Sequence, residues 1–248
     1  MTRSKDEFET AMGLIANGRN DREIQQLTGI PRETVRDWRS GARKGTRGSP
    51  RSDCRTEGHD FATLPAGPYT YLLGMYLGDG HIAPHPRGVW RLRISSDSRY
   101  PGIIDECCRA MEAVMPGQRA YRLLRKPHCV EISMYSKHWP CLFPQHGPGR
   151  KHERAIRLEP WQEHLVHRAT ESFLRGLIHS DGCRVIANDR GVESVRYHFS
   201  NRSEDIKRLF CAALDSLGIP WTRPSDRDIA IYRKEAVARL DRFIGPKQ

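Results

Sequence analysis

The chain has 248 residues, enough to bury a core in one large domain or two smaller ones. Its formal net charge of +11 favours a polyanionic partner, and its seven scattered cysteines argue against a disulfide framework and for the cytoplasm. No apolar run approaches the roughly 20 residues of a membrane span, and the N-terminus lacks the apolar stretch of a secretory signal, so no membrane partner is expected.

Three short segments at the start of the chain are predicted to be helices. Apolar residues recur at helical spacing in DEFETAMGLIANG, where Gly18 is placed to end the helix, and either Asn20 or Asp21 is placed to cap NDREIQQLTG. IPRETVRDWRSG begins with Pro31, whose fixed φ suits a first helical turn. In that third helix Val35 and Trp38 are expected to face inward.

This arrangement resembles a helix-turn-helix of the resolvase or homeodomain-like kind, and we assign it to residues 1–42. The resemblance implies that the third helix enters a major groove of DNA. The side chains left free for DNA are Arg32, Thr34, Arg36 and Arg39. A small three-helix bundle with a solvated basic face would show the same pattern.

The composition changes after Trp38. The stretch RSGARKGTRGSPRSDCRTEGHD is rich in Gly, Ser, Arg and Lys, so residues 43–64 are predicted to form a flexible basic linker. The linker could follow DNA phosphates, or it could be a solvated tether. Cys54 and His59 lack a second pair of ligands, which makes a structural zinc site a poor interpretation.

The rest of the chain is an internal repeat. Each copy opens with an apolar helix that ends in Asp-Gly, seen as YTYLLGMYLGDG and SFLRGLIHSDG. Each continues with an alternating segment (VWRLRISS, SVRYHFSN), a helical segment (IIDECCRAMEAV, DIKRLFCAALDSLG), a strand (EISMYSK, DIAIYRK) and a Gly-Pro turn (GPGRK, GPK). Two halves at 65–151 and 170–248, joined by a connector at 152–169, therefore predict an internal pseudo-two-fold axis.

LLGMYLGDG and LRGLIHSDG resemble the two signature helices of the LAGLIDADG (DOD-type) homing endonuclease family, and the likeness runs from about Pro65 to the C-terminus. The resemblance implies an α+β fold of two pseudo-symmetric αββαββα-type halves that form a DNA-binding saddle. It also implies a monomer that acts on double-stranded DNA in the bacterial cytoplasm, associated with the nucleoid. The alternative is an unrelated α+β repeat.

Small residues lie four apart on one face of each signature helix, as Gly74 with Gly78 and Gly176 with Ser180. A helical Gly costs about 1 kcal/mol relative to Ala, so the pattern indicates a close interface between two helices, one from each half. Gly80 and Gly182 are expected to take the left-handed conformation that ends a helix.

Asp79 and Asp181 are expected side by side at the ends of these helices. The helix dipole and mutual repulsion disfavour two carboxylates there, and Mg²⁺, which prefers carboxylate, water and phosphate oxygens, would relieve both problems. The resemblance implies that each Asp binds Mg²⁺ with the carbonyl of the preceding residue, Gly78 or Ser180, for hydrolysis of one DNA strand. Alternatively, each Asp only caps its helix in solvent.

The family typically places a lysine late in each half. The internal alignment nominates Lys151 and Lys247, each shortly after a Gly-Pro, as the catalytic residues that position the water or stabilise the pentacovalent phosphate. Arg154 and Lys234 are the alternatives. A lysine that contacts phosphate or only solvent would fit the same positions.

The alternating segments place apolar side chains on one face and basic side chains on the other. The apolar sets are Trp90, Leu92, Ile94 and Val195, Tyr197, Phe199; the basic sets are Arg91, Arg93 and Arg196, His198. Two such sheets about a two-fold axis would form a saddle that reads guanine edges. Flanking phosphate contacts are expected from Arg122, Arg125, Lys126, Arg223 and Arg227. A solvated sheet face would show the same alternation.

The sequence therefore predicts a site-specific, Mg²⁺-dependent DNA endonuclease, a hydrolase with a helix-turn-helix targeting module. The alternative is a transcriptional regulator that keeps the fold without cutting DNA. Both acids and both lysines favour the enzyme. The fused helix-turn-helix, and Leu77 and His179 in place of the first acid of the signature, favour the regulator.

Overall fold

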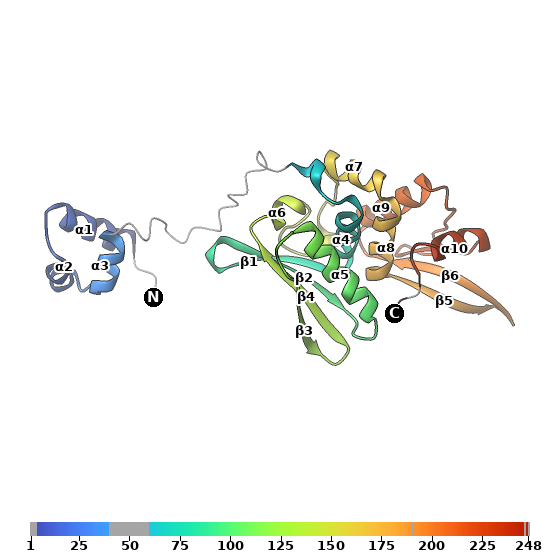
Figure 1. Ribbon diagram of the computed structural model, residues 1–248, viewed down its shortest axis with the longest axis horizontal. Coiled ribbons are helices and arrows are strands. Elements are labelled where there is room, and N and C mark those ends of the chain that lie inside the picture. The colour runs from blue at the N-terminus through green and yellow to red at the C-terminus, as the bar shows by residue number, and fades with distance from the viewer. Residues whose placement is uncertain (1–3, 40–59, 190, 246, 248) are drawn as a thin grey trace. The chain divides into compact units, whose positions relative to one another are not determined.

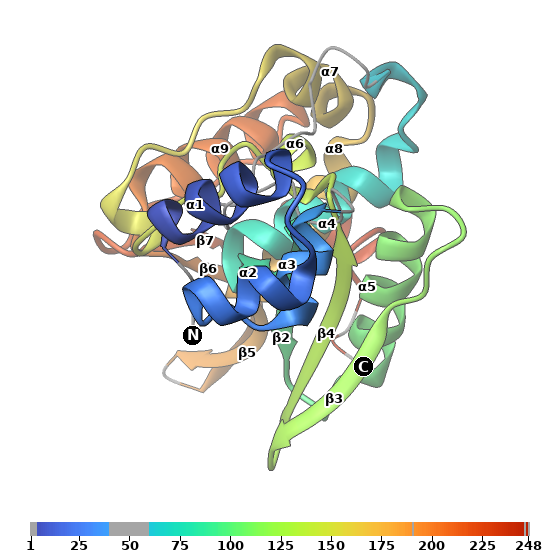
Figure 2. The same cartoon turned by 90° about the vertical axis from the view of Figure 1, so that its left-hand side faces the viewer.

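The computed structural model describes residues 4–39, 60–189, 191–245 and 247. By contacts within the chain it divides into two compact units, Met1–Arg51 and Ser52–Gln248. Figure 1 labels most of the helices and strands of each unit, and Figure 2 also labels β7. No helix among these residues is long and apolar enough to cross a membrane.

The first unit consists of α1 (Lys5–Ala16), α2 (Asp21–Thr28) and α3 (Arg32–Arg39), which fall on the three predicted helical segments. Asn20 accepts hydrogen bonds from the first turn of α2, and Gly18 has the left-handed φ of 75° expected of a residue that follows a helix. Val35 is buried in a small core, and the Trp38 ring meets Phe8 edge-on at 5.1 Å. The predicted inward faces are therefore confirmed.

The sequence predicted that Arg39 is free to contact DNA, but the structure shows it hydrogen-bonded within the first unit. Its guanidinium donates to the Asp21 carboxylate at 2.8 Å and to the Arg19 carbonyl at 2.6 Å, so it ties α3 to the start of α2. Arg32 and Arg36 are exposed and Thr34 is half-buried.

The first half of the second unit follows the predicted αββαββα order. Its elements are α4 (Ala66–Asp79), β1 (Gly80–His85), β2 (Val89–Ser96), α5 (Pro101–Val114), β3 (Tyr121–Lys126), β4 (Cys129–Ser136) and α6 (Trp139–Leu142). The strands form one antiparallel sheet in the order β1-β2-β4-β3. The β3–β4 pair runs alongside α5 (Figure 2), where Arg122 of β3 pairs with Asp105 of α5 at 2.7 Å.

The second half begins after α7 (Pro160–Arg168) and carries one strand fewer than predicted. Its elements are α8 (Thr170–Asp181), β5 (Gly182–Asp189), β6 (Val192–Ser200), α9 (Glu204–Ser216), β7 (Asp228–Ile231) and α10 (Lys234–Asp241), with a sheet in the order β5-β6-β7. A single bridge, Thr222 to Ala230, stands where β3 pairs with β4 in the first half. Pro220 and Pro224 flank this bridge and lack the N–H that a strand ladder needs.

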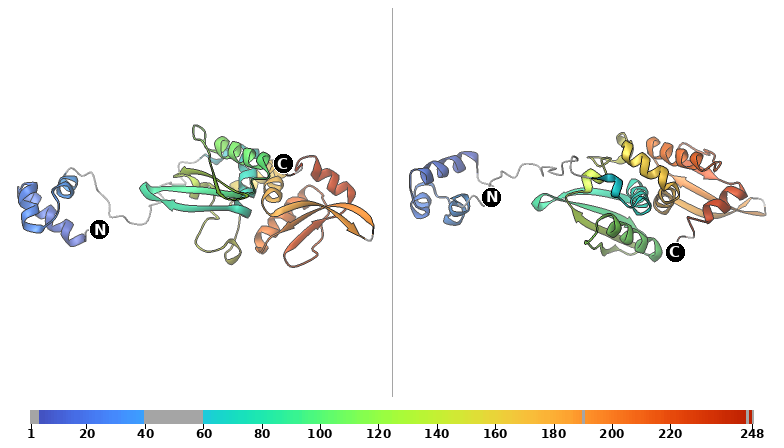
Figure 3. Two further views of the ribbon diagram at one scale, coloured as in Figure 1. Left: turned by 90° about the horizontal axis from the view of Figure 1, so that it is seen from below. Right: turned by 45° about the horizontal axis from the view of Figure 1, so that its top comes forward.

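α4 and α8 lie side by side at the centre of this unit, with one sheet on either side of them (Figures 1 and 3). The alternation of the strands is confirmed, since Leu92, Ile94, Tyr197 and Phe199 are fully buried in a core that also includes both central helices. The unit is thus an α+β fold of two similar halves joined through a helix pair.

The fold of this unit includes residues before the predicted boundary at residue 65. Phe61, in a short 3-10 helix (Phe61–Thr63), stacks on Trp161 of α7 with ring centroids 4.0 Å apart. Residues 60–64 therefore pack on the fold instead of belonging to a linker. Residues 43–59, with Cys54 and His59, lie outside the described residues.

Candidate active site

The close interface between α4 and α8 depends on glycine. A β-carbon on Gly176 would lie 2.2 Å from the Tyr71 carbonyl oxygen, and one on Gly74 would lie 2.6 Å from the Leu177 nitrogen. Because backbone atoms are in the way, neither clash is relieved without separating the helices. Oγ of Ser180, whose shortest hydrogen bonds are to carbonyls of its own helix, also lies 3.4 Å from the Gly74 carbonyl. The predicted helix–helix interface is therefore confirmed.

The two signature carboxylates lie where these helices end. A β-carbon on Gly78 would lie 2.5 Å from the Ser180 β-carbon and 2.9 Å from Oδ2 of Asp181, so the last turns of α4 and α8 touch beside Asp79. Burial, and next the charge of Asp181, raise the pKa of Asp79 from 3.8 to about 6, although one side of this carboxylate is open to solvent. Burial also raises the pKa of Asp181.

Gly80 and Gly182 are not left-handed, contrary to the sequence-based expectation. Gly80 has φ −86° and ψ 153°, and Gly182 has φ −107° and ψ 168°, so each helix runs straight into the following strand. The reason for glycine is space: a β-carbon would lie 2.5 Å from Cα of Tyr76 in one half and 2.7 Å from Cα of Ile178 in the other.

Both predicted lysines reach the ends of the signature helices. Nζ of Lys151 donates to the carbonyls of Tyr76 at 2.5 Å and Gly78 at 2.8 Å, while Nζ of Lys247 donates to the carbonyl of His179 at 3.0 Å. Positive charge at a helix C-terminus is favourable. Burial lowers the pKa of Lys151 to about 8 and also lowers the pKa of Lys247.

The lysines and carboxylates are coupled across the two halves. The charges of Asp181 and Asp79 both oppose the lowering of the Lys151 pKa, and the charges of Cys183, Asp79 and Asp181 oppose the lowering of the Lys247 pKa. Lys151 and Asp181 also line the same cavity. The two carboxylates and the two lysines therefore form one electrostatic cluster that spans both halves.

Asn201, which was not among the predicted site residues, contacts the cluster. Its side-chain amide donates to Oδ2 of Asp181 at 2.6 Å, which counteracts the effect of burial on the Asp181 pKa. Asn201 directly follows β6, and Ser96 holds the corresponding place in VWRLRISS. The alignment could have located the position, but the two halves differ there.

A cavity of about 500 Å³ opens beside Asp181. Its lining includes five cationic side chains, Arg150, Lys151, Arg154, Arg202 and Arg227, together with His81, His146 and His152. Asp181 is the one carboxylate among the described residues that line it. The cavity is therefore suited to a phosphate or another anionic group next to Asp181.

The donors at the helix ends fit a divalent cation that is shared with waters and substrate. The two carboxylates raise the cost of each other's charge, which a cation would remove. The Gly78 carbonyl already accepts a hydrogen bond from Lys151, although its second lone pair leaves room for a metal. Within the described ranges no three or more His, Cys, Asp or Glu side chains group as metal ligands, so water and phosphate oxygens would complete the shell.

The basic faces of the strands are partly neutralised. Glu131 of β4, whose side chain is 7% exposed, pairs with Arg91, with Arg125 at 3.0 Å and with Arg93 at 3.9 Å. Sequence alone did not single out Glu131, because its role depends on the register that places β4 between β2 and β3.

A guanidinium lies over a tyrosine ring on each sheet. Arg91 lies over Tyr135 at 5.5 Å in the first half, and Arg196 lies over Tyr232 at 5.1 Å in the second. Arg196 and His198 are half-buried. These pairs occupy equivalent positions, so the pseudo-symmetry extends from the carboxylates to the sheet faces.

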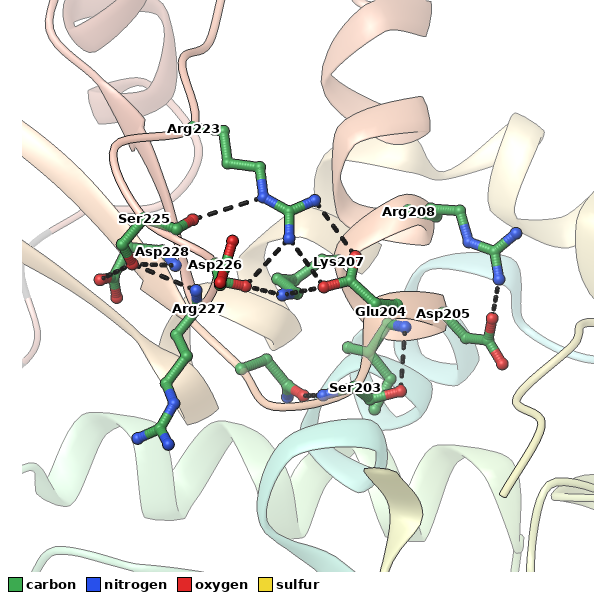
Figure 4. A network of polar contacts seen from close by, with 12 residues as sticks. Ser203, Glu204, Asp205, Lys207, Arg208, Arg223, Ser225, Asp226, Arg227 and Asp228 are labelled. Atoms are coloured by element: carbon green, nitrogen blue, oxygen red, sulfur yellow. Dashed lines mark hydrogen bonds and ion pairs between the residues drawn. The ribbon is translucent and has the colours of Figure 1, made fainter. Parts of the chain in front are cut away.

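Arg223 was predicted to contact phosphate, but it is engaged within the protein. It donates to Glu204 at 2.8 Å and to the Asp226 carbonyl at 3.1 Å, and the buried Lys207 binds the same two groups (Figure 4). Arg227 points away from this network in Figure 4 and lines the cavity beside Asp181. The turn thus offers Arg227 to an anion instead of Arg223.

No family model matches the chain, and neither does any curated protein. Among solved structures, I-DmoI in complex with DNA and Mn is 14% identical over 74% of this chain and 98% of its own, with a TM-score of 0.48. The N-terminal LAGLIDADG domain of DUF199/WhiA is 14% identical over 82% of this chain and 93% of its own, with a TM-score of 0.47. The homing endonuclease I-WcaI bound to its DNA recognition sequence is 13% identical over 82% and 90%, with a TM-score of 0.48. At these identities and TM-scores the likeness to LAGLIDADG proteins is one of fold alone and assigns no activity.

Proposed function

We propose that this protein is a site-specific endonuclease of LAGLIDADG type that hydrolyses phosphodiester bonds of double-stranded DNA with Mg²⁺. The observation that carries the proposal is the cluster of Asp79, Asp181, Lys151 and Lys247 at the ends of two helices in close contact. The basic cavity beside Asp181 supports a phosphate substrate.

Each group has a distinct chemical role in the proposed reaction. Asp79 and Asp181 would hold the cation, which would lower the pKa of a water and offset charge on the leaving oxygen. Lys151, with a pKa near 8, remains mostly protonated at neutral pH and stabilises negative charge that develops on the phosphate. Asn201 orients the Asp181 carboxylate through its amide.

The proposed DNA contacts come from both units. Arg93, Arg196 and His198 lie on the basic faces of the two sheets, and Arg227 lies at the cavity. Arg32, Thr34 and Arg36 are the remaining candidates for groove contacts from α3, as in a helix-turn-helix. We place this activity on chromosomal DNA in the bacterial cytoplasm, with the protein acting as a monomer.

The test is to select bound DNA from a random library and to incubate it with Mg²⁺. Staggered double-strand cuts are expected from the native chain and are expected to vanish in Asp79→Asn and Asp181→Asn. Glu163→Gln, which alters an exposed acid of α7, is the matched control and should cut normally. Specific binding without cutting or nicking would contradict the proposal.

A regulator that binds DNA without cutting it is the second candidate. Both lysines already donate to helix carbonyls, so a structural role at the helix ends would account for them without catalysis. His179, in place of the first signature acid, is buried and has its pKa lowered to about 3, so it is neutral. The selection experiment separates the two candidates, because a regulator gives binding alone.

A further inference from the structure

The two lysines of the cluster lie on short segments outside the sheets and the long helices, here called the connecting segments: the one that leads to Lys151 and the one after α10 that leads to Lys247. Lys151 follows the loop that starts at Gly147, and Lys247 follows Gly245 near the end of the chain. Lysine side chains lose much conformational freedom when they are fixed in place. The backbone of each segment must therefore be held firmly if its amine is to stay at the helix ends.

In the first half, the Arg154 guanidinium binds the backbone of the loop that starts at Gly147. Nη1 of Arg154 donates to the carbonyls of Gly147 at 3.0 Å, Pro148 at 3.2 Å and Gly149 at 3.0 Å. Its Nη2 and Nε donate to the Gln145 carbonyl at 2.9 and 3.3 Å. The Arg154 side chain thus binds four carbonyls in the segment just before Lys151.

In the second half, Arg175 of α8 holds the segment before Lys247. Its Nη1 donates to the carbonyls of Phe243 and Ile244. Its Nε and Nη2 bind the Glu106 carboxylate at 2.8 Å each, and Glu106 lies on α5 of the first half. His179 approaches the same Ile244 carbonyl with Nε2 at 3.4 Å.

The two arrangements reach the same result by different routes. Arg154 acts locally, on carbonyls five to nine residues away, whereas Arg175 acts 68 and 69 residues away and is oriented by the other half. In the aligned signatures, Leu73 stands where the second half has Arg175. The internal repeat therefore does not account for Arg175.

We propose that Arg154 and Arg175 are positioning residues, each of which holds the carbonyls of one connecting segment and thereby fixes Lys151 or Lys247 at the carboxylate pair. Arginine suits this role because its planar fork donates several hydrogen bonds in fixed directions, which lysine cannot do. Removal of either arginine leaves carbonyls without a donor and releases the segment. That each arginine fixes its segment does not depend on the proposed function. Only the expected effect on DNA cleavage rests on the proposed endonuclease activity.

The test measures how fast each lysine is acetylated in the full chain, without DNA or metal, by mass spectrometry. In Arg175→Leu we expect Lys247 to react about tenfold faster and Lys151 to react at the native rate, since only one set of hydrogen bonds is lost. In Arg154→Leu we expect the reverse. Arg239→Leu, an exposed arginine of α10, is the control and should change neither rate.

Native protection of Lys247 in Arg175→Leu would overturn the proposal, and so would equal acceleration of both lysines, which indicates general loosening. Arg175→Lys keeps the charge without the fork, so Lys247 should remain accelerated; full protection would refute the role of the fork. Glu106→Gln provides a second variant should Arg175→Leu fail to fold. It weakens the orientation of Arg175 and should accelerate Lys247 by a smaller factor.

A cleavage assay then separates this inference from the proposed function. If the chain cuts DNA, each arginine variant should nick one strand and leave the other intact, because only one lysine is displaced. Selective exposure of a lysine in a chain that never cuts DNA would count against the endonuclease and leave both positioning roles supported. Double-strand cutting at the native rate by both variants would overturn the importance of the positioning for catalysis.

Discussion

At the scale of single residues, the structure places charge where it is costly. Asp79 is the last residue of α4 and lies at the negative end of its dipole, and Asp181 has the same position at the end of α8. The charge of Asp181 also raises the pKa of Asp79. Lys151 and Lys247 relieve part of this cost, yet the pKa of Asp79 remains about 6. A protein that kept these carboxylates for stability alone would gain by losing one of them.

Asp79→Asn is therefore expected to stabilise the metal-free protein at neutral pH. The pKa of Asp79 is higher in the folded chain, at about 6, than its ordinary value of 3.8, so the native protein loses stability as the pH rises through this range. The full shift corresponds to about 3 kcal/mol, and the solvent-exposed side of the carboxylate reduces this to about 1 kcal/mol. Urea unfolding at pH 4 and pH 7.5 should show a gain at pH 7.5 only; an equal gain at both would contradict the assignment.

Lys151 is expected to set the alkaline limit of activity. Because its pKa is lowered to about 8, it loses its charge above that pH, and single-turnover cleavage should fall tenfold per pH unit there. Lys151→Arg keeps the charge at all relevant pH values, so its cleavage rate, even if lower, should not fall between pH 8 and 9.5. The same decline in both proteins would show that another group titrates.

At the scale of elements, the contact between α4 and α8 explains the small residues of the signature. Three glycines are fixed there by backbone or carboxylate atoms within 3 Å of where a β-carbon would be: Gly74, Gly78 and Gly176. Spacing alone revealed this face, because residues four apart share one side of a helix. It did not reveal the conformation of Gly80 and Gly182, since a helix that continues directly into a strand requires contact information.

Gly176→Ala is expected to destabilise the protein by about 3 kcal/mol, because the new methyl group would meet the Tyr71 carbonyl and force the helices apart. Gly67→Ala is the matched control in α4, where the nearest side-chain atom, Oγ of Ser172, is 3.5 Å away. There alanine should be neutral or stabilising by up to about 1 kcal/mol. Denaturant unfolding measures both. Similar losses in the two variants would contradict the proposed contact.

Most of the elements could be predicted because the sequence contains an internal repeat, in which each half supports the assignment of the other. The paired helices, the inward faces of β2 and β6, and the positions of both acids and both lysines follow from the aligned halves. Glu131 and the contact between Arg175 and Ile244 could not, because each depends on strand register or on a distant segment. The aligned halves locate the position of Asn201, but not its contact with Asp181, because the first half has Ser96 there. The missing strand of the second half was expected from the family resemblance alone, and Pro220 and Pro224 are the sequence features that argue against it.

At the scale of the whole molecule, the two units divide the proposed work. The second unit contains the cluster and the cavity, and its charged faces are moderated by Glu131 and Glu204. The first unit offers exposed arginines on α3 with no acid bound to them in the described contacts, since Arg39 alone of that set is paired. We therefore expect changes in the first unit to alter the affinity for DNA more than they alter the cleavage rate of bound DNA.

Arg36→Ala should weaken binding to selected DNA while leaving the single-turnover cleavage rate of bound DNA unchanged. If Arg36 contacts a phosphate, affinity falls and the slope of log affinity against log salt decreases by about 1, because one fewer counterion is released. Arg168→Ala removes the same charge from an exposed position on α7 and serves as the control for net charge. Fluorescence anisotropy between 50 and 300 mM salt measures both variants. Equal affinity and slope in Arg36→Ala and the native protein would show that Arg36 does not contact a phosphate and would count against docking of α3 on DNA.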